Sequence, residues 1–226
     1  MKRPGALVVS AVLLATPLVA QRSVTFPTVD GGVVDADEYG GGPRGVVLAH
    51  GGRLDKRSWA PQARRIAEAG FRVVAINFRG RGDSRAGSTL EPGDEGLRFD
   101  VLGAVRYLRR SGATAVTVVG ASFGGGAAAE ASLAAEAGEI NGQILLAHST
   151  IRSPEKLKGR TLFIVSRGDP QADGTPRLVS IRDQFRRAPE PKRLVVLRGS
   201  AHAQFIFDTP QSERLLQEVL AFLKAQ

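Results

Sequence analysis

Residues 116–131 read V-T-V-V-G-A-S-F-G-G-G-A-A-A-E-A, and this stretch constrains the fold more than any other part of the chain. Four β-favouring residues lead into Gly120, Ser122 lies between Gly120 and Gly124, and an alanine-rich run typical of a helix follows. The order predicts a strand, a very tight turn and a helix, with one hydroxyl group at the apex of the turn. Glycines fit at 120 and 124 because such a turn brings strand and helix almost into contact. The pattern matches the G-x-S-x-G turn that exposes a nucleophilic serine, and a glycine-rich turn with an incidental serine is the alternative.

The length and composition favour one soluble globular domain. At 226 residues the chain is long enough to bury a substantial core, and the absence of cysteine excludes disulfides and thiolate metal sites. The net charge of +9 comes mostly from arginines that are spread along the chain, with pairs at 64–65, 109–110 and 186–187. No aromatic platform is interleaved with these arginines, so they indicate solvated helix faces and no nucleic-acid partner.

The N-terminus has the pattern of a secretory signal peptide. Lys2 and Arg3 precede an apolar run from 6 to 20, and Ala20 is a suitable last residue before cleavage. The run is shorter than the roughly 20 residues of a comfortable membrane span. We therefore predict that residues 1–20 are removed and that the protein is secreted or periplasmic, without stable membrane insertion afterwards. An uncleaved N-terminal anchor is the alternative.

Residues 21–226 predict a single α/β domain with no repeat or linker. A hairpin is expected first, followed by short apolar strands that mostly alternate with helices, which favours a mostly parallel sheet of about eight strands flanked by helices. The expected strands are 23–28, 33–39, 45–49, 71–77, 116–120, 143–147, 161–166 and 193–198, and the expected helices are 58–69, 97–112, 123–137, 176–187 and 210–223. Residues 148–160 are too few to hold a cap domain.

Three histidines are available to activate Ser122. A serine hydroxyl needs a base, which a carboxylate in turn orients. His202 follows the last predicted strand, at the carboxyl edge of the sheet where open α/β sheets place their sites, and is the expected base. His50 begins an H-G-G sequence and is expected to shape a loop that donates a backbone N–H. His148 ends another strand and is interpreted as a structural histidine.

Asp169 is the expected carboxylate, since it follows the predicted strand 161–166 through Arg167-Gly168 at the same edge. Asp173 lies four residues further on and is the alternative acid. Asp83, in an arginine-rich loop, is interpreted as a turn residue.

The resulting order of serine, acid and histidine along the chain is that of the α/β-hydrolases. Over nearly its whole mature length the chain resembles this superfamily, and its cap-less form resembles the dienelactone-hydrolase-like and small carboxylesterase branches. The matching motifs are H-G-G (50–52), N-F-R-G-R-G-D-S (77–84), G-A-S-F-G (120–124), G-D (168–169) and A-H (201–202). Dienelactone hydrolases carry cysteine at the elbow, whereas this chain has serine, which favours ordinary esters or thioesters. The aspartate nucleophile of haloalkane dehalogenases and epoxide hydrolases is also missing.

These residues predict a serine hydrolase in which Ser122, His202 and Asp169 form a catalytic triad, with no metal or organic cofactor. The backbone N–H groups of Phe123 and Gly52 are expected to bind the oxyanion. The expected substrate is a small acyl ester, with preference for short or water-soluble acyl groups. A peptidase or acyltransferase would use the same triad, and a non-catalytic binding protein of this fold would lack a triad member.

Basic residues follow several predicted strands at this edge, which suggests an anionic substrate as a further hypothesis. Acidic residues in the same loops (Asp55, Asp83, Asp94 and Glu95) weaken the argument. The basic residues are Arg53, Lys56, Arg57, Arg79, Arg81, Arg85, Arg152 and Arg167.

Overall fold

The computed structural model describes residues 20–88 and 95–225, so the predicted signal peptide lies outside the described residues except for Ala20. Within the described residues one sheet of eight strands has the order β1-β2-β4-β3-β5-β6-β7-β8. β2 pairs antiparallel with β1 and β4, and all the other neighbouring pairs are parallel. The strands are β1 (Gln21–Pro27), β2 (Val33–Tyr39), β3 (Arg44–Ala49), β4 (Arg72–Ile76), β5 (Ala115–Ala121), β6 (Gly142–Leu146), β7 (Arg160–Ser166) and β8 (Lys192–Leu197).

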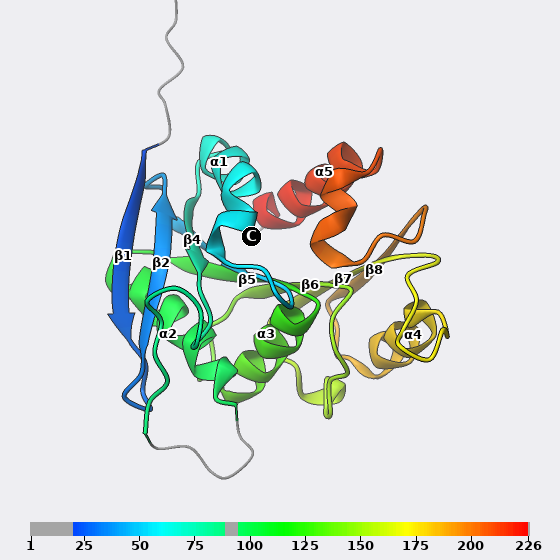
Figure 1. Ribbon diagram of the computed structural model, residues 1–226, viewed down its shortest axis with the longest axis horizontal. Coiled ribbons are helices and arrows are strands. Elements are labelled where there is room, and N and C mark those ends of the chain that lie inside the picture. Colours follow the sequence, from blue (N-terminus) through cyan, green and yellow to red (C-terminus); the bar gives the residue numbers. More distant parts are fainter. Residues whose placement is uncertain (1–19, 89–94, 226) are drawn as a thin grey trace, which may run out of the picture.

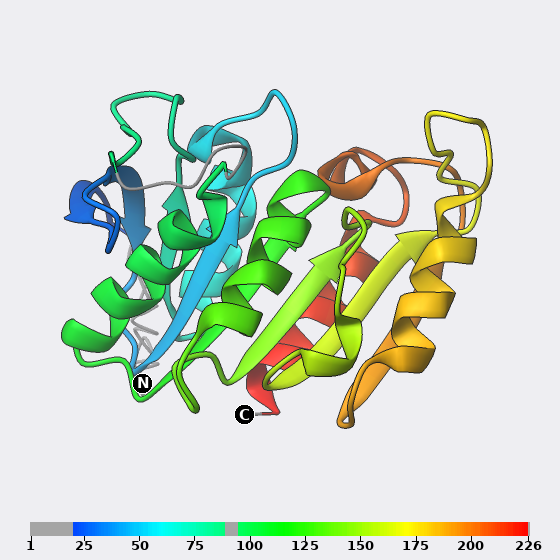
Figure 2. The same ribbon diagram turned by 90° about the horizontal axis from the view of Figure 1, so that it is seen from below.

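Helices cover both faces of this sheet. Figures 1 and 2 show α1 (Ala60–Glu68) and α5 (Ser212–Lys224) on one face, and α2 (Leu97–Arg110), α3 (Phe123–Ala134) and α4 (Arg177–Arg187) on the other. Three short 3₁₀ helices complete the described elements: η1 (Lys56–Trp59), η2 (Pro154–Lys156) and η3 (Ala203–Asp208). None of the helices in the described ranges is long and apolar enough to cross a membrane.

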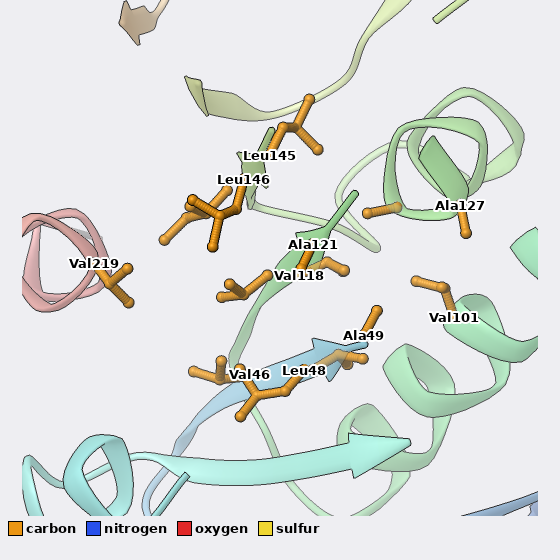
Figure 3. Packing of buried hydrophobic residues seen from close by; sticks show 14 of the residues in the cluster. Val46, Leu48, Ala49, Val101, Val118, Ala121, Ala127, Leu145, Leu146 and Val219 are labelled. Carbon is orange, nitrogen blue, oxygen red and sulfur yellow. The ribbon is translucent and has the colours of Figure 1, made fainter. Parts of the chain in front are cut away.

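The central strands are apolar on both faces because helices bury both sides of a parallel sheet. All residues of β6 are buried, and so are the last five of β3. Figure 3 shows Val46 and Leu146 on the side of the sheet that faces Val219 of α5. Ala49 lies on the side that faces Ala127 of α3. The alternation of the strands thus supplies two cores, one on each side of the sheet.

The predicted α/β-hydrolase architecture is confirmed, and strand boundaries agree with the expected ranges within two residues. The helix after β5 was expected to reach residue 137 but ends at Ala134. Its C-cap Ala135 is extended, and the carboxylate of Glu139 accepts the N–H of Glu136 at 2.8 Å, so the chain turns instead of continuing the helix. The connection from β6 to β7 contains only η2, which agrees with the expected lack of a cap.

Candidate active site

Ser122 occupies a strained turn between β5 and α3. Its φ of 52° and ψ of −119° lie outside the regions that ordinary residues favour. Its backbone is held from both sides: its N–H donates to the Leu146 carbonyl at 2.8 Å, and its carbonyl accepts the N–H of Ser149 at 3.1 Å. The carbonyl also accepts the N–H of Gly125 at 2.9 Å. Hydrogen bonds to β6, to the residues that follow it and to the first turn of α3 therefore hold Ser122 in this strained conformation.

The glycines of this turn have the steric role that the sequence predicts. A Cβ on Gly120 would lie 2.7 Å from the Cα of Gly125. A Cβ on Gly124 would press against the carbonyl oxygens of His50 and Ala49. Both positions are thus closed to any side chain, and the turn packs directly against the end of β3.

The structure brings Ser122, His202 and Asp169 into one chain of hydrogen bonds. Nε2 of His202 lies 2.7 Å from Oγ of Ser122, and Nδ1 of His202 lies 2.7 Å from Oδ2 of Asp169. The three residues follow β5, β8 and β7 at the carboxyl edge of the sheet. With a carboxylate at Nδ1, the ring carries its proton there and leaves Nε2 free to accept the serine proton.

Asp169 is buried, with a side chain that is 1% exposed. The backbone N–H of Arg177 donates to its carbonyl at 2.8 Å, and Nε of Arg177 lies 3.2 Å from Oδ2. The alternative acid, Asp173, is exposed and accepts hydrogen bonds from Thr175. The structure therefore brings Asp169, and not Asp173, to His202.

His50 is fully buried behind the H-G-G loop, where burial lowers its pKa. Its Nε2 accepts the N–H of Phe78 at 3.3 Å, so the ring joins this loop to the end of β4. His50 thus supports the loop, as the sequence indicates. Because its Nε2 already accepts the N–H of Phe78, His202 and not His50 is placed to take the serine proton.

The two residues whose N–H groups are expected to bind an oxyanion lie beside one cavity of about 410 Å³. Gly52 and Phe123 both line it, together with the apolar side chains of Phe78 and Leu97. Phe123 is the first residue of α3, so its N–H has no intrahelical acceptor and points with the positive end of the helix dipole. Gly52 has a φ of 37° that suits glycine.

Several of the basic residues named from the sequence neutralise internal carboxylates. Nζ of Lys56 contacts Asp35 at 2.6 Å and Asp37 at 2.9 Å. Arg79, with a side chain only 6% exposed, lies 2.7 Å from Asp30 and 2.8 Å from Asp100. Lys56 and Arg79 thus stabilise the fold, and the exposed Arg57 pairs with Asp55 at 2.6 Å. The exposed residues that remain to be considered for an anionic substrate are Arg53, Arg81, Arg85, Arg152 and Arg167.

His148 lies behind the elbow and is 1% exposed. Its Cβ would be only 2.7 Å from a Cβ on Gly125, and its ring packs beside Phe163 with centroids 5.4 Å apart. Burial, with a smaller contribution from the charge of Arg177, lowers its pKa to about 4, so the ring is neutral near pH 7. This position fits the structural role that the sequence indicates.

Two polar residues of the site were not predicted from the sequence, namely Gln204 and Arg177. Gln204 accepts the N–H of Gly51 at 2.7 Å, and Arg177 contacts the Asp169 carboxylate. The A-H-A-Q sequence contains no motif that would single out the glutamine, because its partner is 153 residues away. Arg177 opens a helix with an arginine-rich sequence and has no local signal either.

The chain matches the alpha/beta hydrolase family over residues 46–221 and belongs to this family. Among curated proteins it is similar to bifunctional epoxide hydrolase 2 of Sus scrofa, with 34% identity over 88 residues. That segment is 39% of this chain and 15% of the epoxide hydrolase, so the chain spans a small part of this relative.

Solved structures of low sequence identity share the fold. A predicted CIB-like hydrolase from Thermoplasma acidophilum is 21% identical, with a TM-score of 0.73 over 92% of this chain and 100% of that chain. An esterase from Pyrococcus furiosus is 18% identical, with a TM-score of 0.72 over 100% of this chain and 97% of that chain.

Proposed function

We propose that the protein is an exported serine hydrolase that cleaves carboxylic esters or thioesters of small molecules through an acyl-enzyme. The observation that carries this proposal is the chain of hydrogen bonds from Ser122 through His202 to Asp169, with both contacts at 2.7 Å. Membership in the alpha/beta hydrolase family supports it, and the esterase from Pyrococcus furiosus is a structural neighbour named for ester hydrolysis.

In the proposed reaction His202 removes the proton from the Ser122 hydroxyl as the oxygen attacks the acyl carbonyl. Asp169 keeps the imidazole in the required tautomer and stabilises the imidazolium. The N–H groups of Phe123 and Gly52 bind the oxyanion of the tetrahedral intermediate, a contribution that typically changes turnover by about 10²–10³ for each donor. His202 then protonates the leaving alcohol or thiol. A water molecule that His202 deprotonates in the same way attacks the acyl-enzyme and releases the acid.

The nucleophile separates this proposal from the chemistry of the epoxide hydrolase relative. Epoxide hydrolases of this fold attack with aspartate and form an alkyl ester, whereas residue 122 is serine. A serine alkoxide that opened an epoxide would leave a stable ether, from which the enzyme could not be regenerated by hydrolysis. We therefore place the substrate among acyl compounds.

The test is covalent labelling of the mature protein with a fluorophosphonate, beside Ser122→Ala and Ser111→Ala. Ser111 lies at the end of α2, at the opposite edge of the sheet, and serves as a matched control. We expect one phosphonyl group on the native protein and on S111A, and none on S122A. A native protein that does not label, or an S122A variant that labels equally, contradicts the proposal.

Substrate class is then tested with p-nitrophenyl esters of increasing chain length, with thioesters and peptides alongside. We expect short acyl esters to react fastest, because no cap domain covers the site between β6 and β7. Succinyl and butyryl esters compared at low and high salt test the anionic-substrate hypothesis. Equal salt dependence contradicts a role for the exposed arginines.

Export is a separate part of the proposal and rests on residues 1–20. The mass of the protein recovered from the periplasm or medium checks it, and an N-terminus at Gln21 is expected. A full-length chain retained in the membrane fraction would instead support an uncleaved anchor.

A further inference from the structure

The side chain of Gln204 connects the loop of His202 to the H-G-G loop. Gln204 lies in η3, two residues after His202, and is 7% exposed. Its Oε1 accepts the N–H of Gly51 at 2.7 Å, and its Nε2 donates to Oγ of Ser58 at 3.0 Å. Since a backbone N–H can only donate, the oxygen end of the amide must face Gly51. The side chain is therefore fixed at both ends.

The H-G-G loop packs directly against the elbow at this point. A Cβ on Gly51 would lie 3.3 Å from the Cβ of Ser122 and 3.2 Å from the carbonyl oxygen of Ala121. The same hypothetical atom would lie 3.5 Å from Oε1 of Gln204. Gly51 is thus enclosed between Ser122 and Gln204. A shift of the Gly51 backbone would therefore change the space beside the Ser122 side chain.

Two hydrogen bonds fix the peptide planes on either side of Gly51. The first is the bond from the Gly51 N–H to Gln204, and the second is the bond from the N–H of Leu54 to the Gly51 carbonyl, at 3.0 Å. Because the peptide is planar and trans, the N–H of Gly52 points away from that carbonyl. The direction of the Gly52 N–H is therefore set by the orientation of the peptide that joins Gly51 to Gly52.

The loop has little conformational preference of its own, since it contains two adjacent glycines. The bond from Leu54 is local, whereas Gln204 reaches the loop from another part of the chain. We propose that Gln204 is a positioning residue, which holds the Gly52 N–H where it meets the oxyanion and couples this donor to the loop of the base. The inference rests on the proposed hydrolase function.

The test compares Gln204→Met with Gln204→Glu and with the matched control Gln143→Met. Methionine keeps the length of the side chain but cannot accept the Gly51 N–H, whereas glutamate keeps an acceptor. Gln143 is also a buried glutamine and lies near the start of β6, at the opposite end of the sheet, where its Nε2 donates to Thr161 at 3.2 Å. Q143M therefore reports what the loss of a buried amide does to stability alone.

For Q204M we expect kcat to fall about 10- to 100-fold, with KM changed less than about twofold. The misplaced Gly52 N–H would bind the oxyanion of the transition state less well, whereas binding of the substrate would change little. Affinity for a trifluoromethyl ketone, which forms a tetrahedral oxyanion adduct on serine, should fall in parallel. Q204E should recover most of the loss, and Q143M should keep native kcat even where its melting temperature falls. Hydrogen exchange of the Gly51 amide, followed by NMR, should be fast in Q204M and slow in the other three proteins.

Native kcat in Q204M, or an equal loss of kcat in Q143M, would overturn the role of Gln204 while leaving the hydrolase proposal intact. Slow exchange of the Gly51 amide in a folded Q204M would also overturn it. A native protein that neither labels with fluorophosphonate nor hydrolyses esters removes the proposed function and this role with it.

Discussion

Arg177 and His202 contact the same carboxylate oxygen of Asp169, at 3.2 Å and 2.7 Å. The guanidinium and the imidazole therefore share one carboxylate oxygen, so Arg177 helps to fix the position of the group that orients His202.

Replacing Arg177 with methionine should lower kcat/KM for a p-nitrophenyl ester by roughly 10-fold, because the side-chain contact that helps to fix the Asp169 carboxylate is lost. The exposed Arg182 of the same helix provides the control, R182M, which should keep the native value. Equal kcat/KM for native protein and R177M would show that the guanidinium does not help to position the carboxylate.

His148 should make the protein sensitive to acid. Burial lowers its pKa to about 4 in the folded state, whereas the ordinary value is about 6.5. The unfolded chain therefore takes up a proton below about pH 6.5 that the folded protein does not. The free energy of unfolding should fall as pH decreases from about 6.5 to about 4, by up to about 3 kcal/mol.

Urea unfolding of native protein and His148→Gln at pH 7 and pH 4.5 isolates this effect, because the carboxylates titrate alike in both. We expect a smaller loss of stability on acidification in H148Q, whatever its stability at pH 7. Equal losses would mean that His148 is accessible to protons in the folded state.

Gly124 and Gly126 offer a matched pair in the first turns of α3. Alanine at 124 would press against the backbone oxygens of His50 and Ala49, whereas at 126 its Cβ would lie 3.2 Å from the side chain of Ser149. We expect G124A to unfold or to lose all activity. G126A should stay folded, since alanine favours a helix by about 1 kcal/mol over glycine and offsets the tight contact. Thermal melting and turnover of a p-nitrophenyl ester check both, and a stable, active G124A would contradict the proposed packing of the elbow.

Arg79 should contribute strongly to stability. Its guanidinium lies between the carboxylates of Asp30 and Asp100, and the Asp100 side chain is completely buried. Arg79→Met removes the cation that both share and should lower the free energy of unfolding by about 3–5 kcal/mol. Arg81→Met, two residues away on the surface, should change it by less than about 0.5 kcal/mol. Similar midpoints of chemical unfolding for the two variants would contradict this role.

Local sequence was sufficient to predict the elbow. The strand, Gly120, Ser122, Gly124 and the alanine-rich helix all lie within sixteen residues, and each follows from backbone propensity and steric limits. The positions of Asp169 and His202 also followed, because parallel strands bring their carboxyl ends to one edge. The choice between Asp169 and Asp173 needed the structure, since it depends on how the loop after β7 folds over His202.

The contacts of the charged residues could not be predicted in the same way. From the sequence, Lys56 and Arg79 were both expected at the carboxyl edge of the sheet and available to a substrate. In the structure Lys56 begins η1, and each of the two cations binds two carboxylates from distant segments. Gln204 is the opposite case: no sequence motif points to it, and yet its buried amide oxygen accepts the N–H of Gly51. These pairings depend on side-chain packing between segments far apart in the sequence, which periodicity and motif spacing do not encode.

The order of the strands has a consequence for when the protein becomes reactive. The proposed nucleophile follows the inner strand β5, while the base follows β8, the outermost strand of the sheet. A growing chain completes the elbow long before it reaches His202, 80 residues later. On the proposed mechanism the serine has no base, and is therefore unreactive, until β8 pairs with β7. Turnover is then a direct assay for completion of the sheet.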